Sequence, residues 1–227
     1  MIALAEITAA TEALLASAAR LDDDGVRAPS LLPGWTRGHV LTHLARNADG
    51  GTRLLTWART GVESYEYPGL EARAAEIAEG AGRPADALLA DVRESADRFA
   101  EAFTLMPDEA WERTVQWTTG ARHPAARAAD ARLTEVLIHH VDLDAGFTPG
   151  DWPAGFTARL LVSVTASFAR RDDAPNLRLY ATDTGQEHGN GDLVVTGPAT
   201  SLLAWLLGRS PGTALTGAEG IEIPFLY

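Results

Sequence analysis

The chain of 227 residues contains no cysteine and no lysine, so all nineteen of its basic side chains are arginine. The absence of cysteine excludes a disulfide framework, thiolate metal ligands and a cysteine nucleophile. Thirty-one Asp and Glu side chains give a formal net charge of −12 at pH 7. This acidity argues against nucleic acid and against anionic membrane surfaces as partners, because both require clustered positive charge.

Long apolar runs are also missing, since no stretch reaches the roughly eighteen apolar residues that a spanning helix requires. The first residues, MIALAE, lack the basic start of a signal peptide. We therefore expect a cytoplasmic protein without membrane association, and no feature points to an obligate protein partner. The length is ample for a real core and corresponds to one or two domains.

What the chain has in abundance is alanine and other apolar residues, at 46% hydrophobic content, which predicts a helix-rich globular protein. Thr36 is a good N-cap, Pro84 suits a first helical turn and Gly146 suits a helix end. The stretch 60–83 is mixed and receives no assignment. Amphipathic helical patterns cover residues 3–20, 37–48, 84–105 and 131–145.

The pattern changes after Trp152, where period-two alternation typical of strands appears. The prediction is therefore mainly α with a smaller α+β part: a four-helix bundle over residues 1–150 and an α+β domain over residues 151–227. The expected elements of the second domain are helices at about 156–170 and 198–207 and strands at 177–182, 192–196 and 220–223.

Ionisable residues four apart share one face on two of the predicted helices. His39 and His43 form such a pair on the first, and Glu135 and His139 form one on the second. The second helix is otherwise largely apolar, so its ionisable stripe, which Asp142 extends, must face something other than apolar core. Two bundle helices that present inward ligands in this way can build a metal site.

Two histidines and a glutamate, without thiolates, match a catalytic zinc site in which water or substrate takes the fourth position. The spacing does not choose between His39 and His43 as a ligand. It is also compatible with ordinary surface pairs, or with core histidines that are satisfied by hydrogen bonds.

Two segments resemble the metal motifs of the mycothiol-dependent maleylpyruvate isomerase family, which belongs to the wider DinB-like group of four-helix metal bundles. The first is LPGWTRGHVLTHL at residues 32–44, and the second is TEVLIHHVDL at residues 134–143. The segment PDEAW at residues 107–111 is similar to the family as well. A helical part followed by a small α+β part is also the family's order.

The resemblance implies that His43, Glu135 and His139 hold a zinc ion or another divalent metal. It gives His39 a role at the helix start or behind a ligand, and it assigns His140 to the neighbouring helix face.

Two further residues, Asp142 and Arg209, follow from the same resemblance, whereas Arg46 is a candidate because it lies on the same helix stripe as His43. Asp142 would orient a ligand histidine through its second ring nitrogen, or else sit in a polar interior. Arg209 matches a family arginine implicated in the active site, although a cation at a helix C-terminus also compensates the helix dipole. Because arginine suits carboxylates, Arg209 is the first candidate for binding the substrate and Arg46 is the second.

The resemblance further implies an enzyme that converts maleylpyruvate to fumarylpyruvate with mycothiol as thiol cofactor, in aromatic catabolism by the gentisate pathway. The thiolate would add to the cis double bond, the adduct would rotate about a single bond, and the thiolate would leave. Zinc would lower the pKa of the thiol.

Other functions stay open. The nearest is a mycothiol S-transferase of the same fold that acts on another electrophile, in detoxification or biosynthesis. A non-catalytic ligand-binding module, with purely structural histidines, is an alternative from another class. A metalloprotease is disfavoured because the sequence has no His-Glu-x-x-His motif.

Overall fold

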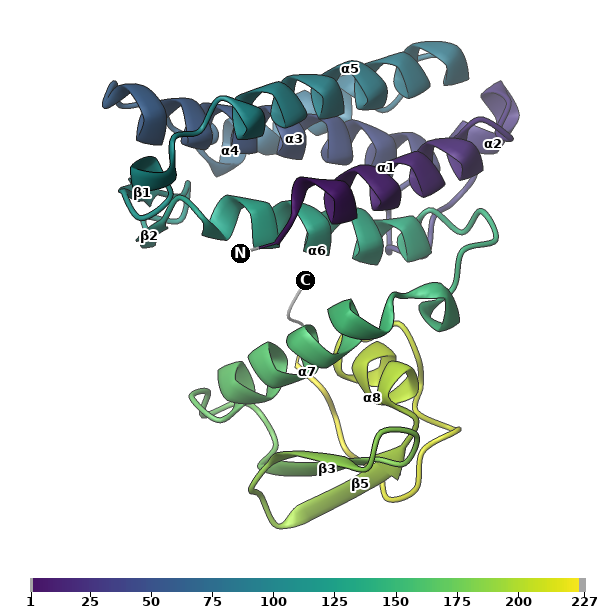
Figure 1. The fold of residues 1–227 in the computed structure, drawn as a ribbon. Helices are drawn as coiled ribbons and strands as arrows, with labels where there is room; N and C mark the ends of the chain where they lie inside the picture. The colour runs from purple at the N-terminus through teal and green to yellow at the C-terminus, as the bar shows by residue number, and fades with distance from the viewer. Residues whose placement is uncertain (1, 225–227) are drawn as a thin grey trace. The chain divides into compact units, whose positions relative to one another are not determined.

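The computed structural model describes residues 2–224, which divide between residues 147 and 148 into two compact units (Figure 1). The described residues are mainly α-helical with a smaller α+β part, as the sequence predicts. No helix among them is both long and apolar enough to cross a membrane.

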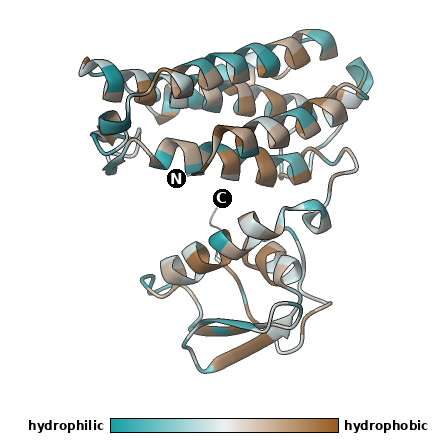
Figure 2. Ribbon diagram, in the orientation of Figure 1, coloured by the Kyte–Doolittle hydropathy of each residue, from teal (hydrophilic) through white to brown (hydrophobic). Residues whose placement is uncertain are grey.

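The N-terminal unit is built on four long helices that close a bundle (Figure 1). Helices α1 and α3 each contact both α5 and α6. Brown and teal residues alternate along these helices in Figure 2, as expected for amphipathic elements with one buried face. Their bounds are Leu4–Ala18 for α1, Arg37–Thr60 for α3, Ala85–Thr104 for α5 and Arg127–Asp142 for α6.

The bundle core consists of large apolar side chains from all four helices. Leu14, Leu44, Phe99 and Val136 are among those fully or almost fully buried. Burying each such side chain stabilises the fold by about 1.5–3 kcal/mol relative to leaving it in water. Shorter elements complete the unit: α2 (Asp23–Arg27), α4 (Leu70–Gly80), a 3-10 helix (Asp108–Ala110) and an antiparallel hairpin of β1 (Thr114–Gln116) and β2 (Arg122–Pro124).

Helix α3 begins where the sequence predicts but continues to Thr60, well past the expected end at residue 48. The glycines that follow residue 48 allow close packing instead of ending the helix. A Cβ atom on Gly50 would lie 2.7 Å from Glu66 Cγ, and one on Gly51 would lie 2.7 Å from the Phe99 ring. The helix ends at Gly61, whose φ of 75° is a left-handed conformation that favours glycine.

The other predicted helices of this unit are present with shifted ends. Helix α6 begins at Arg127 and ends at Asp142, before the expected 131–145, and Asp144 and Gly146 then adopt positive φ. The unassigned stretch 60–83 contains α4, and the β1–β2 hairpin lies in a region for which no strand was expected.

The C-terminal unit packs two helices with a small mixed sheet. The strand order is β4-β3-β5, with β3 antiparallel to β4 and parallel to β5. Leu179 lies opposite His188 on one side and Val195 on the other, and Leu179 and Val195 are fully buried. The bounds are Ala154–Phe168 for α7, Leu177–Ala181 for β3, Gln186–Gly189 for β4, Leu193–Gly197 for β5 and Ala199–Leu206 for α8.

The expected strand at residues 220–223 is wrong, because these residues form no strand in the described chain. Besides its pairing with β3, strand β5 forms one isolated bridge, between Thr196 and Thr216. Gly217 and Gly220 follow this bridge with φ of 82° and 73°, so the backbone turns instead of continuing as a strand.

Candidate metal centre

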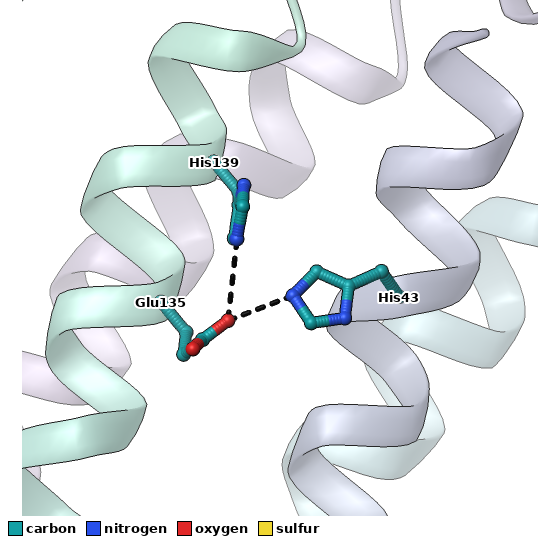
Figure 3. A group of neighbouring side chains, drawn as sticks. All are labelled: His43, Glu135 and His139. Atoms are coloured by element: carbon teal, nitrogen blue, oxygen red, sulfur yellow. Dashed lines mark hydrogen bonds and ion pairs between the residues drawn. The ribbon is translucent and has the colours of Figure 1, made fainter. Parts of the chain in front are cut away.

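Three side chains from two helices meet inside the N-terminal bundle (Figure 3). His43 comes from α3, and Glu135 and His139 come from α6. Glu135 Oε2 lies 2.7 Å from His43 Nε2 and 3.3 Å from His139 Nε2. One ligand atom from each residue lies within 4.8 Å of the others. The structure therefore brings together the three residues that the sequence nominates.

The two helices are joined beside this cluster by a buried arginine. Arg132 lies one turn before Glu135, and its NH1 atom donates to Leu44 O at 2.8 Å and to Asn47 Oδ1 at 2.9 Å. Burial lowers the pKa of Arg132 to about 10, so the side chain stays charged at neutral pH. The sequence interpretation missed this residue, although its i, i+3 spacing from Glu135 places it on the same helix face.

A carboxylate lies behind His139. His139 Nδ1 is 2.8 Å from Asp142 Oδ2, and Asp142 is almost completely buried. Burial by itself would lower the pKa of His139, but its hydrogen bonds to Asp142 and Glu135 outweigh burial and raise the pKa to about 9. Asp142 thus fixes the ring with Nε2 towards Glu135, which is the orienting role that the family resemblance implies.

The surroundings of His43 are different. Burial lowers its pKa to about 4, against the opposing effect of Glu135. Arg73 NH2 lies 3.0 Å from His43 Nδ1. Because a guanidinium group only donates, Nδ1 accepts this bond and the ring proton resides on Nε2, which donates to Glu135.

Glu135 lies between the two imidazoles as a carboxylate. Burial would raise its pKa, but the hydrogen bonds from His139 and His43 hold the pKa well below its usual value. The carboxylate therefore lies between His139, whose pKa is raised, and His43, whose pKa is lowered.

The other histidines of the two helices do not join the cluster. His39 forms a capping box with Thr36 at the start of α3, and its ring stacks on Trp35. His140 Nε2 lies 2.8 Å from Ser17 Oγ of α1, and its ring stacks on Phe147. Spacing leaves His39 and His43 equivalent, whereas the geometry places only His43 beside Glu135.

The two arginines proposed for carboxylate binding occupy different parts of the chain. Arg46 forms ion pairs with Asp49 and Asp91, which also pair with Arg98 and Arg83 respectively. Arg209 follows α8 in the C-terminal unit, where its NH1 atom donates to Leu207 O at 2.6 Å.

The sequence interpretation missed Arg73, which lies in the stretch left unassigned.

The donor chemistry of the cluster fits a zinc ion. Two neutral imidazole nitrogens and one carboxylate oxygen form a catalytic-type set, which leaves one position of a tetrahedral site for another ligand. The buried setting and the carboxylate behind His139 are also typical of metal-binding histidines.

The fold and the site define a class: a four-helix bundle with an interior two-histidine, one-carboxylate cluster, followed by a small α+β unit. Residues 7–144 match the N-terminal domain of mycothiol maleylpyruvate isomerase, and residues 151–222 match the C-terminal domain (MDMPI) of that enzyme. The chain therefore belongs to the mycothiol maleylpyruvate isomerase family, which confirms the resemblance drawn from the sequence.

Solved structures agree with this membership. The crystal structure of a mycothiol-dependent maleylpyruvate isomerase matches with a TM-score of 0.89, and that of a histidine-to-alanine mutant of such an isomerase matches with 0.88. Each is 30% identical to this chain, and each match covers 97% of this chain and 93% of the other. No curated protein matches the chain.

Proposed function

We propose that this protein is a zinc-dependent and mycothiol-dependent cis–trans isomerase that converts maleylpyruvate to fumarylpyruvate. The observation that carries the proposal is the buried cluster of His43, Glu135 and His139 within a chain of this family. The activity named for the two solved relatives supports the choice of thiol and substrate.

His43, Glu135 and His139 would hold the zinc. When bound, zinc would supply a position for the mycothiol sulfur and lower the pKa of the thiol, so that thiolate is present at neutral pH. The protein has no cysteine, so the sulfur nucleophile has to come from the small-molecule thiol.

The proposed isomerisation needs no net gain or loss of atoms. The thiolate forms a C–S bond to one alkene carbon, and the π electrons move into the conjugated carbonyl to give an enolate. The former double bond can then rotate. The enolate electrons re-form the double bond as the C–S bond breaks, so the same thiolate is released and no side chain has to act as acid or base.

Two of the chain's own side chains would position the metal ligands. Asp142 keeps His139 oriented, and Arg132 holds the two ligand helices together. We retain Arg209 as the first candidate for binding a substrate carboxylate, on the family resemblance. Arg46 is the weaker candidate because it is already engaged in ion pairs with Asp49 and Asp91.

The test is an assay of the purified, zinc-loaded protein with mycothiol and maleylpyruvate, in which fumarylpyruvate is measured by chromatography. We expect product only when protein, zinc and thiol are all present. Isomerisation at the full rate without added thiol would contradict the proposed mechanism.

A parallel assay with mycothiol and monobromobimane separates the nearest alternative. Protein-dependent conjugation without formation of fumarylpyruvate would identify a mycothiol S-transferase. A non-catalytic binding module would show neither reaction and would contain no stoichiometric zinc. The cytoplasmic location and the place in aromatic catabolism by the gentisate pathway belong to the same proposal.

A further inference from the structure

A small cavity lies between α1 and α5 of the N-terminal unit, and none of the three residues of the candidate metal centre lines it. Its volume is about 120 Å³. Because a single water needs at least about 10–15 Å³ of such space, the cavity has room for a molecule of several heavy atoms. Its lining includes apolar side chains from both helices and one arginine from α6: Leu4, Ile7, Leu15, Phe99 and Arg132.

Arg132 is a buried cation with spare hydrogen-bond donors. The residue is only 2% exposed, and its NH1 atom binds Leu44 O and Asn47 Oδ1. Its Nε and NH2 atoms form no hydrogen bond with any residue that the structure describes. Buried polar groups are nearly always paired, so unpartnered ones mark a place for water or an ion. A buried charge without a partner is also costly, so the guanidinium favours a ligand that carries a negative charge.

The negative charges near Arg132 offset part of its charge but do not pair with it. Glu135 and Asp49 both raise the pKa of Arg132 against the effect of burial. Glu135 is hydrogen-bonded by the two histidines of the cluster, and Asp49 pairs with two other arginines. Tyr67 is also near, but burial raises its pKa to about 12, so it is neutral at pH 7. Among residues 2–224, none of these groups forms an ion pair with Arg132.

The polar part of the lining also fits a carboxylate with a single charge. Thr8 and Thr11 of α1 line the cavity, and their hydroxyls make no hydrogen bond within the described part of the chain. The exposed side chains at the cavity are Glu12, Arg93 and Asp97, with a net charge of one negative unit. A ligand with a second carboxylate would place it near Glu12 and Asp97, which like-charge repulsion disfavours.

We propose that the cavity between α1 and α5 binds a short-chain monocarboxylate, with its carboxylate against Arg132 and Thr11 and its alkyl chain against the apolar side chains. Arginine and hydroxyl donors match a carboxylate, and the alkyl chain removes apolar surface from water. A halide ion would fill the charged part and leave the apolar part wet. The site is separate from the proposed isomerase function and does not depend on it.

The test uses propionate, titrated by calorimetry into the zinc-loaded protein. Propionamide, which has the same shape without the charge, and malonate, which has a second carboxylate, are the comparison ligands. We expect propionate to bind about 10- to 100-fold more tightly than propionamide, the range of a charge-assisted hydrogen bond. Malonate should bind the cavity more weakly than propionate.

A variant that fills the cavity separates it from the zinc, which can also bind a carboxylate. Ala100→Leu places a larger side chain in the lining and should lower propionate affinity at least about tenfold, and only the binding that it removes is assigned to the cavity. The matched control is Ala90→Leu, an exposed alanine of the same helix that does not line the cavity. It should stay within about threefold of the wild type.

Two further variants test the polar contacts. Arg132→Met should lower propionate affinity by about 10- to 100-fold. Thr11→Val keeps the shape of the side chain and loses its hydroxyl, so it should weaken binding by about three- to tenfold, even where Arg132→Met fails to fold.

Equal propionate affinity in the wild type and Ala100→Leu would overturn the proposal, as would equal affinity of the cavity for propionate and propionamide. A crystal structure of the propionate-soaked protein should show the ligand between α1 and α5. Ordered water alone in the cavity would contradict the proposal.

Discussion

The two histidines of the candidate metal centre stand in opposite electrostatic settings. On the α6 side, Asp142 lies behind His139, and the pKa of His139 is raised to about 9. On the α3 side, Arg73 lies behind His43, and burial lowers the pKa of His43 to about 4. The same residue type, facing the same Glu135 oxygen, thus has its proton affinity shifted in opposite directions.

This difference indicates a division of roles between the two sides. A carboxylate behind a ligand imidazole fixes its orientation and raises its basicity, which strengthens metal binding. Arg73 lies behind His43 and cannot give its ring this support, because a guanidinium group only donates hydrogen bonds. We therefore expect changes behind His139 to affect metal binding by the cluster.

The largest expected effect comes from removing the α3 ligand. His43→Ala should lower zinc affinity by more than the roughly 100-fold that marks the upper range for changes behind a ligand, because it deletes a ligand itself. Chelator competition measures this. His39→Gln is the matched control, since glutamine is suited to the same position of a capping box, and it should bind zinc like the wild type. Zinc loss in His39→Gln with zinc kept in His43→Ala would reverse the assignment.

A smaller effect is expected from the residue behind the α6 ligand. Asp142→Asn should weaken zinc binding by about 10- to 100-fold, because a neutral amide supports the basicity of His139 less than a carboxylate does. Asp130→Asn, an exposed change on the same helix, should have no effect on zinc affinity. Indistinguishable zinc affinities for these two variants would remove the contrast between the two sides of the site.

A further prediction concerns the pH dependence of stability, measured on protein without zinc. The pKa of His139 is raised to about 9, so its contribution is fully present below the unfolded value of 6.5 and is lost as pH rises towards 9. The pKa of His43 is lowered to about 4, so its contribution is lost as pH falls from 6.5 towards 4. Each histidine changes the free energy of unfolding by on the order of 3 kcal/mol across its pH range.

Urea unfolding of zinc-free protein between pH 4 and 9 measures both losses of unfolding free energy, the acidic one from His43 and the alkaline one from His139. In Asp142→Asn the alkaline loss of unfolding free energy should be smaller, because the hydrogen bond that raises the pKa of His139 is weakened. If wild type and Asp142→Asn lose the same unfolding free energy as pH rises towards 9, Asp142 does not set the protonation of His139.

Much of the α6 side could be predicted from the sequence, because Glu135, His139 and Asp142 lie on one face of one helix. Helical spacing alone brings these side chains together, and no tertiary information is needed. The choice of His43 over His39 needed the family resemblance, since both lie on the same face of α3. Only the capping geometry of Thr36 and the position of α6 separate the two histidines.

The contact of Arg73 in α4 with His43 in α3 could not be predicted, because it joins segments that are distant in sequence. Arg73 lies thirty positions after His43 in a stretch without clear periodicity, and no local pattern indicates that the two meet. The extension of α3 was missed for a related reason. Gly50 and Gly51 favour a break by local propensity, whereas tertiary packing against Glu66 and Phe99 requires small residues inside the helix.

The most direct test of the central claim is the zinc content of the purified wild type beside that of His139→Ala, with His140→Gln as the neighbouring control. The account predicts one zinc per chain in the wild type and in His140→Gln, because His140 contacts Ser17 and not the cluster. It predicts no stoichiometric zinc in His139→Ala. Equal zinc in the wild type and His139→Ala would contradict the assignment of the site.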